Sequence, residues 1–173
     1  MVISAFERYD KGEMQRLIPA AMAITTVLMF TGCLSFFQTD VNINGDGDYV
    51  TRIGKSKTTT IEAMLSSGGE YRISYAYIDS HWLLAEKLII DTDCCIIQLD
   101  FPEPVRVDNG KGAVIETDTI KVRRNLLEQI LESANPVISL QGEQGTVIIE
   151  IGYESKQNLK ELLDYGIKEF PEI

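Results

Sequence analysis

The spacing of apolar residues changes along the chain, and each change predicts a different kind of element. From Thr58 to Val122, apolar residues alternate with polar ones or form short runs bounded by Gly, Pro, Asn and Asp. This pattern is typical of β-strands joined by tight turns. It predicts five strands, at residues 60–65, 71–78, 82–90, 94–100 and 113–122. The second strand places a row of large side chains on one face, which we interpret as core: Tyr71, Ile73, Tyr75 and Tyr77.

Helical spacing begins after Val122. Apolar residues recur at helical intervals over Arg123–Ala134, and Asn135-Pro136 ends this predicted helix. Two more strands follow at residues 137–140 and 146–151, joined by a four-residue turn. A last helix is predicted with Ser155 as its N-cap. Its expected buried stripe consists of Leu159, Leu162, Leu163, Ile167 and Phe170.

The predicted order is five strands, a helix, two strands and a helix. It favours an α+β fold with a mainly antiparallel sheet of about seven strands and both helices packed on one face, because each element has one apolar side to bury. A chain of 173 residues is expected to form one folded domain. We predict that this domain spans residues 58–173.

A long apolar run precedes the predicted domain. Residues 17–37 carry no formal charge over 21 positions, which is long enough to span a bilayer as a helix. The most apolar part, Leu17–Phe30, has 14 residues, a length typical of the apolar region of a signal peptide. Met14 opens a short basic segment directly before the run. We therefore predict that Met14 is the true initiator and that residues 1–32 form a signal peptide.

The residues at the end of this run, Phe30-Thr31-Gly32-Cys33, resemble the lipobox of bacterial lipoproteins. The resemblance covers residues 14–33 and departs from the pattern at Phe30, where leucine is commonest. It implies that the Cys33 thiol receives a diacylglycerol, that the chain is cut between Gly32 and Cys33, and that the new N-terminus is acylated. The alternative is an uncleaved transmembrane helix over the same residues.

The resemblance also implies where the protein resides. A lipid-anchored protein of this class lies in the cell envelope, outside the cytoplasm. Leu34, rather than aspartate, follows the cysteine. In a Gram-negative host this implies the outer membrane, with the domain facing the periplasm.

Residues 33–57 are rich in Asn, Asp, Gly, Ser and Thr, which predicts a lipid-attached polar tether. Within it, four residues fit positions 1, 3, 5 and 9 of an EF-hand calcium loop: Asp40, Asn42, Asn44 and Asp48. Position 12, which should be a bidentate glutamate, is Thr51. A turn-rich spacer is therefore the preferred interpretation, and calcium binding through residues 40–51 is the alternative.

The chain is acidic, with a formal net charge of −10. Residues 1–32 carry three bases and three acids, so the whole excess belongs to the rest of the chain. An acidic body repels phosphate backbones and anionic lipid surfaces. This charge argues against nucleic-acid binding and assigns membrane attachment to the N-terminal segment.

Few residues have the spacing that catalysis requires. His81 is the sole histidine, and no CxxC pair or glycine-rich phosphate loop occurs. Cys94 and Cys95 are adjacent on a predicted strand, where side chains point to opposite faces. An ordinary disulfide between them would therefore be strained. The preferred interpretation is that one thiol is buried and the other partly covered; the alternatives are a link to another chain and a vicinal disulfide that acts as a labile redox element. Glu116 and Asp118 share one strand face and form a candidate carboxylate pair.

These observations favour a non-enzymatic envelope lipoprotein that binds or positions another envelope component, either a protein or a glycan. The alternative is an envelope hydrolase that uses carboxylates. A concave cluster of poorly solvated acids would favour the hydrolase, whereas an exposed aromatic or sheet-edge patch would favour the binding protein. No cofactor is expected other than the calcium of the alternative interpretation.

Overall fold

The computed structural model describes residues 42–43, 47–102 and 104–171, and nearly half of them lie in antiparallel β-strands. Sheet A has six strands in the order β1-β2-β3-β4-β8-β7, and sheet B has four in the order β10-β9-β5-β6. The strands are β1 (Asn42–Ile43), β2 (Tyr49–Lys55), β3 (Thr59–Leu65), β4 (Tyr71–Asp79), β5 (Ala85–Asp91), β6 (Ile96–Asp100), β7 (Val105–Asp108), β8 (Val114–Lys121), β9 (Val137–Gly142) and β10 (Gly145–Glu150).

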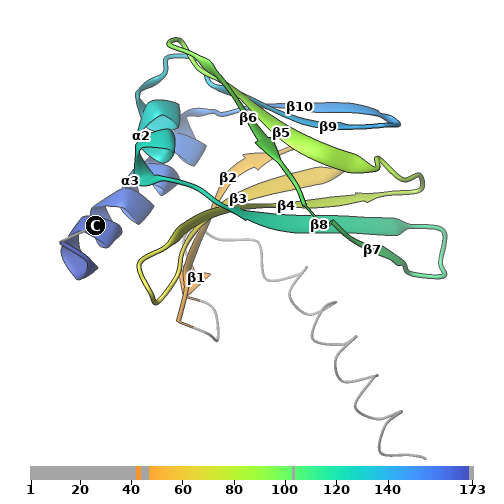
Figure 1. The fold of residues 1–173 in the computed structure, drawn as a ribbon, viewed down its shortest axis with the longest axis horizontal. Coiled ribbons are helices and arrows are strands. Elements are labelled where there is room, and N and C mark those ends of the chain that lie inside the picture. Colours follow the sequence, from red (N-terminus) through yellow and green to blue (C-terminus); the bar gives the residue numbers. More distant parts are fainter. Residues whose placement is uncertain (1–41, 44–46, 103, 172–173) are drawn as a thin grey trace, which may run out of the picture. The chain divides into compact units, whose positions relative to one another are not determined.

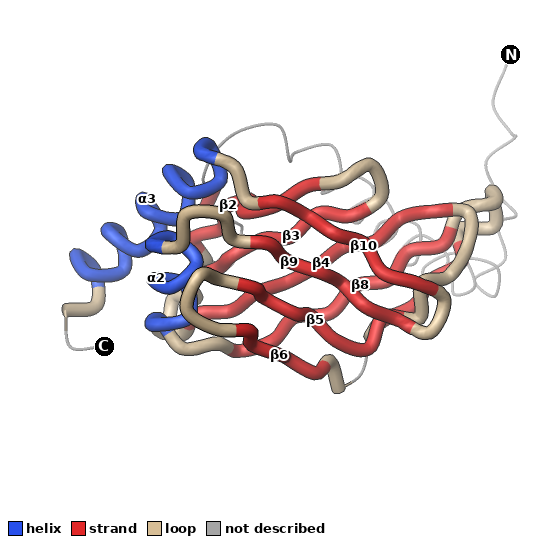
Figure 2. The backbone as a smooth tube through the Cα atoms, turned by 90° about the horizontal axis from the view of Figure 1, so that it is seen from above, coloured by secondary structure: helices blue, strands red, loops and turns tan. Residues whose placement is uncertain are grey.

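The two sheets face each other, and both helices lie at one end of them (Figures 1 and 2). The helices are α2 (Arg124–Glu132) and α3 (Tyr153–Glu169). The inner faces of the sheets contribute fully buried side chains to one core, including Ile61 and Ile73 from sheet A and Leu88 and Leu140 from sheet B.

The α+β class and the antiparallel pairing are confirmed, but the single sheet of about seven strands is wrong. The described residues form nine strands of at least four residues in two sheets, besides the two-residue β1. The chain leaves sheet A after β4, forms the β5–β6 hairpin in sheet B, and returns with β7 and β8. An apolar strand face is buried equally well against a helix or a second sheet, so alternation alone does not distinguish these packings.

The predicted boundary of the folded domain is also corrected. β2 occupies residues 49–55 inside the predicted tether, and its Ile53 is fully buried. Polar residues and Gly54 conceal this strand in the sequence. A Cβ on Gly54 would lie 2.8 Å from Cγ2 of Ile149, so the glycine lets β2 of sheet A approach β10 of sheet B closely. The short strand β7 follows Pro104 and was likewise not expected.

Both predicted helices are present, with corrected ends. α2 ends at Glu132, and Ala134 is exposed outside it. α3 begins at Tyr153 with Gly152 as its N-cap, in place of the predicted cap Ser155. Neither helix of the described part has the length and apolar character needed to cross a membrane.

The buried stripe of α3 contains a glycine at the place expected for a large side chain. Leu159, Leu162 and Leu163 are buried as predicted, whereas Ile167 is 48% exposed. Gly166 takes its place, and a Cβ there would lie 2.0 Å from the hydroxyl oxygen of Tyr71. The ring of Tyr165 stacks on that of Tyr49 with centroids 4.2 Å apart, which also holds α3 against β2.

We predict that Gly166→Ala destabilises the protein, although alanine normally stabilises a helix interior by about 1 kcal/mol relative to glycine. The added methyl group overlaps the Tyr71 hydroxyl, and such overpacking costs about 1–3 kcal/mol. Urea unfolding measures the change in the free energy of unfolding. In a Tyr71→Phe background the loss should be smaller, because the overlapping oxygen is gone. An increase in stability in both backgrounds would contradict this packing.

Candidate functional site

Glu116 of β8 belongs to the predicted carboxylate pair, and its side chain has no exposed surface. One carboxylate oxygen accepts the backbone N–H groups of Leu83 and Leu84, the second at 2.8 Å. The other oxygen accepts the N–H of Ala85 at 2.9 Å and lies 3.5 Å from Nε of Arg106. These bonds, made to three consecutive backbone N–H groups, fix the position of the Glu116 side chain.

The segment that Glu116 holds, residues 83–85, has an unusual backbone. Leu84 has φ of 54°, a left-handed conformation that is uncommon for a residue other than glycine. The carbonyl oxygens of Leu83 and Leu84 accept N–H bonds from Gln144 and Glu143, at 3.1 and 3.3 Å. A Cβ on Gly142 would lie 2.3 Å from the Leu83 oxygen. The 83–85 segment is therefore fixed on one side by β8 and on the other by the β9–β10 turn.

The predicted carboxylate pair is not arranged for catalysis. The oxygens of Glu116 are occupied by the 83–85 segment and Arg106, so they cannot bind a substrate without losing these bonds. Asp118 lies on the same face, and its Oδ2 is buried without a hydrogen-bond partner in the described part. The Tyr75 hydroxyl is buried in the same way, and its burial, with both carboxylates nearby, raises the pKa of Tyr75.

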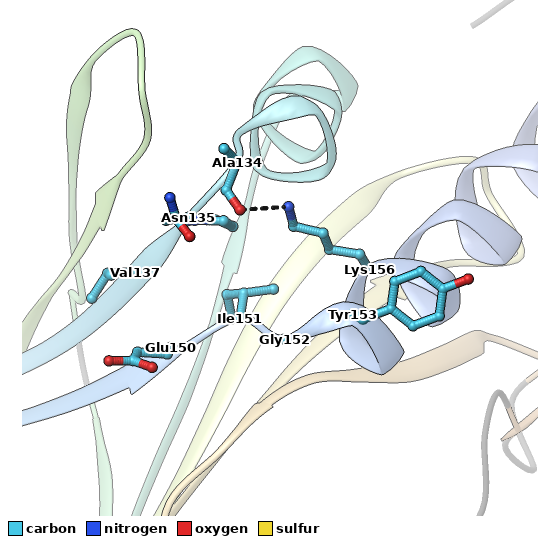
Figure 3. Close-up of a pocket in the computed structure, with 9 residues that line it drawn as sticks. Ala134, Asn135, Val137, Glu150, Ile151, Gly152, Tyr153 and Lys156 are labelled. Atoms are coloured by element: carbon cyan, nitrogen blue, oxygen red, sulfur yellow. Dashed lines mark hydrogen bonds between the residues drawn. The ribbon is translucent and has the colours of Figure 1, made fainter.

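A pocket of about 520 Å³ lies where the α2–β9 loop, the end of β10 and the start of α3 meet (Figure 3). Ile151 and Pro136 supply buried apolar surface, and Asn135, Glu150 and Lys156 supply polar groups. Lys156 extends from α3 to the loop, where its ammonium group donates to the carbonyl oxygens of Ser133 and, at 3.2 Å, Ala134. Tyr153 is 79% exposed, and its ring points away from Ala134 in Figure 3.

The tip of the β5–β6 hairpin is attached to the same loop. The Asp93 carboxylate accepts the N–H of Ala134, and the N–H of Asp93 donates to the Ser133 hydroxyl at 3.2 Å. The bond from Ala134 is the main reason why the pKa of Asp93 lies below its ordinary value. Ala134 also lines the pocket, so it connects this hairpin tip to the pocket.

The structure brings Cys94 and Cys95 together, contrary to the expectation of opposite faces. Thr92 and Cys95 exchange two backbone hydrogen bonds, of 3.0 and 3.3 Å, so Cys94 belongs to the turn rather than to a strand. The two sulfur atoms lie 3.0 Å apart. The Thr92 hydroxyl lies 3.3 Å from the Cys94 sulfur and 3.5 Å from the Cys95 sulfur. The turn therefore places both thiols beside one hydroxyl.

The structure also places several other predicted residues. His81 is exposed, and its Nδ1 lies 2.8 Å from the Ser80 hydroxyl. Tyr71, Tyr75 and Tyr77 are buried, so their assignment to the core is confirmed. The described residues contain no group of three or more His, Cys, Asp or Glu side chains that could hold a metal ion.

The calcium hypothesis stays a prediction. Asp40 and Asn44 lie outside the described residues, and Asn42 belongs to β1. Asp48 accepts the N–H of Ser67 at 3.1 Å. β2 begins at Tyr49, within the proposed loop and ahead of the place where an EF-hand would begin its second helix. Met14, Gly32, Cys33 and the apolar run lie outside the described residues as well.

Glu62 of β3 is an unusual acid that the sequence did not reveal. Burial raises the pKa of Glu62 to about 7, and the charge of Arg52, its neighbour across β2 and β3, opposes this rise. Nε of Arg52 is itself buried without a hydrogen-bond partner in the described part. Strand alternation assigns Glu62 to the face opposite the core, where an acid is ordinarily solvated, so no sequence signal marked it.

Comparisons with known proteins show no relative by sequence: no protein family and no curated protein matches the chain. One solved structure is similar, the crystal structure of invasion associated protein B from Bartonella henselae. The similarity covers 76% of this chain and 97% of that one, with 9% sequence identity and a TM-score of 0.45. Likeness at this level carries no argument about function.

We predict that Glu116→Gln lowers the free energy of unfolding by about 3 kcal/mol, because an amide NH₂ would face backbone donors that now meet a carboxylate. Urea unfolding tests this. The matched control is Glu86→Gln on an exposed part of β5, which should change stability by less than about 0.5 kcal/mol. Equal effects of the two substitutions would contradict a structural role for Glu116.

We predict that Glu62→Gln stabilises the protein by an amount that grows with pH. The folded-state pKa of about 7 lies above the ordinary 4.5, so the folded protein holds this proton more tightly than the unfolded chain. The stability that the wild type keeps below pH 4.5 is therefore lost as the pH rises towards 7. The advantage of the variant should grow from near zero to at most about 3 kcal/mol above neutral pH.

The measurement is the difference in unfolding free energy between Glu62→Gln and wild type across this pH range. Glu86→Gln serves again as the control, because its side chain is exposed. A difference for Glu62→Gln that does not vary with pH would show that this carboxyl group titrates normally.

Proposed function

We propose that this protein is an envelope lipoprotein, anchored by lipid on Cys33, whose β-sandwich domain binds another envelope component in a non-enzymatic role. The observation that carries the proposal is the sequence Phe30-Thr31-Gly32-Cys33 directly after a 14-residue apolar core. Acyl chains contribute about 0.8 kcal/mol per buried CH₂, and two chains give stable attachment. The acidic domain gains nothing from anionic lipid, which supports an anchor at the N-terminus.

A binding role receives support from the described residues. Both carboxylate oxygens of Glu116 accept hydrogen bonds from the 83–85 segment, and His81 is an exposed loop residue. Glycoside hydrolysis commonly requires two carboxyl groups at a defined separation, but among the residues that line the pocket only Glu150 is an acid. These arrangements favour binding over hydrolysis.

We propose that the pocket at the start of α3 is the binding surface. It combines apolar surface from Ile151 and Pro136 with polar groups of both charges from Glu150 and Lys156. Pockets of this mixed kind bind ligands through apolar contact and a few orienting polar groups. The exposed ring of Tyr153 beside it can contact either a protein side chain or a sugar ring.

The lipid anchor predicts that the full chain, expressed in a Gram-negative host, is recovered from the membrane as a product that begins at an acylated Cys33. Cys33→Ser should accumulate at its uncut mass, because the thiol that accepts the lipid is absent. Mass spectrometry of the purified protein measures both. Cys94→Ser is the matched control and should be processed normally. An uncut, unacylated wild-type chain in the membrane would support the transmembrane alternative instead.

The same cells can test the binding surface. A photo-crosslinking residue in place of Tyr153 should capture one envelope component, and the same residue in place of Thr119, which is exposed on sheet A, should not. Capture from position 153 should depend on an intact Cys33, which brings the domain to the membrane. Identical products from both positions would contradict a binding surface at the pocket.

A further inference from the structure

We propose that Cys94 and Cys95 form a reversible dithiol–disulfide couple at the tip of the β5–β6 hairpin, oxidised by exchange with the disulfide of a small thiol compound or of a thiol oxidoreductase. This inference goes beyond the proposed function and does not depend on it. It rests on the turn geometry of the described residues.

The turn holds the two thiols adjacent before any bond forms. Their sulfur atoms are 3.0 Å apart, and the backbone hydrogen bonds between Thr92 and Cys95 close the turn around Cys94. Asp93 fixes the turn from outside through its bonds to Ser133 and Ala134. Ring closure therefore needs little loss of chain entropy, because folding has already ordered these residues.

The two cysteines are placed for different steps. Cys94 is exposed, so an external disulfide can reach its sulfur, whereas Cys95 is half-buried. Hydrogen bonds from the Thr92 hydroxyl and from the Cys95 thiol hold the pKa of Cys94 below its ordinary value, although the charge of Asp93 opposes this. A larger thiolate fraction favours Cys94 as the first nucleophile.

The reaction then has two balanced steps. The Cys94 thiolate attacks one sulfur of a disulfide R–S–S–R, which forms a mixed disulfide and releases one RS⁻. The Cys95 thiolate attacks the Cys94 sulfur, forms the Cys94–Cys95 bond and expels the second RS⁻. The two thiol protons go to the two released thiolates, so the cysteines are oxidised and R–S–S–R is reduced to two R–SH. Excess R–SH reverses both steps.

Glutathione buffers of increasing oxidised fraction test the couple in the full native chain. After thiols are blocked with N-ethylmaleimide, trypsin releases the peptide of residues 88–106, between Lys87 and Arg106, which contains both cysteines and no other. We expect this peptide to change from a form with N-ethylmaleimide on both cysteines to an unmodified form. The mass of the unmodified form should be that of the dithiol peptide minus two hydrogens, as a disulfide requires. The native chain should reach half-oxidation at a concentration of oxidised glutathione at least about tenfold lower than the urea-unfolded chain.

Several outcomes would overturn the proposal. They are an identical midpoint in the unfolded chain, glutathione retained on a single cysteine of the wild type, and a disulfide between two chains. Cys95→Ser provides the matched control, because it should stop at the mixed disulfide with glutathione on Cys94.

Thr92 is proposed as a positioning residue for this couple. Thr92→Val keeps the side-chain shape but removes the hydroxyl, so the pH profile of Cys94 alkylation should shift to higher pH. Thr92→Ser, which keeps the hydroxyl, should restore the wild-type profile. An unchanged profile in Thr92→Val would show that the hydroxyl does not act on the thiol, and the exchange midpoint of the wild type would still decide the couple itself.

Discussion

The buried carboxylate of Glu116 is the interaction on which the relation between the two sheets depends. It reaches from β8 of sheet A to three consecutive backbone N–H groups where the chain enters β5 of sheet B. A carboxyl group without solvent exposure is stable only when its oxygens have hydrogen-bond partners. The 83–85 segment provides these partners, and this requirement explains why Leu84 adopts a left-handed conformation.

The end of the sandwich that carries the helices is organised by contacts of a different kind. Here the α2–β9 loop is tied to the β5–β6 turn by Asp93 and to α3 by Lys156. The pocket and the thiol pair therefore share one loop, residues 133–136, as a common support. Hydrogen bonds to Ser133 and Ala134 thus connect the two features by a short and contiguous path.

The binding interpretation and the hydrolase interpretation differ in what they require of the acids. The chain has 26 acidic residues, so an acid pair on one strand face has little weight before the surroundings are known. The carboxylate of Glu116 is bonded to backbone N–H groups and lies beside Arg106. Glu62 lies on the opposite face of sheet A, where its neighbour across the strands is Arg52. Glu116 and Glu62 are thus separated by the sheet itself, and they do not form a catalytic pair.

The sequence by itself determined both helices and most of the strands, the α+β class, the buried face of β4 and the acidity of the body, because these depend on residue spacing and composition. It also supplied the apolar run and Cys33 on which the anchoring proposal depends. Only the tertiary structure decided the division into two sheets and the strand conformation of β2. It also decided the hydrogen bonding of Glu116, the raised pKa of Glu62, the contact of Gly166 with Tyr71 and the proximity of the Cys94 and Cys95 sulfur atoms. The period of a strand is local, whereas strand pairing and burial depend on residues far away in the chain, such as Leu83 and Glu116, which are 33 positions apart.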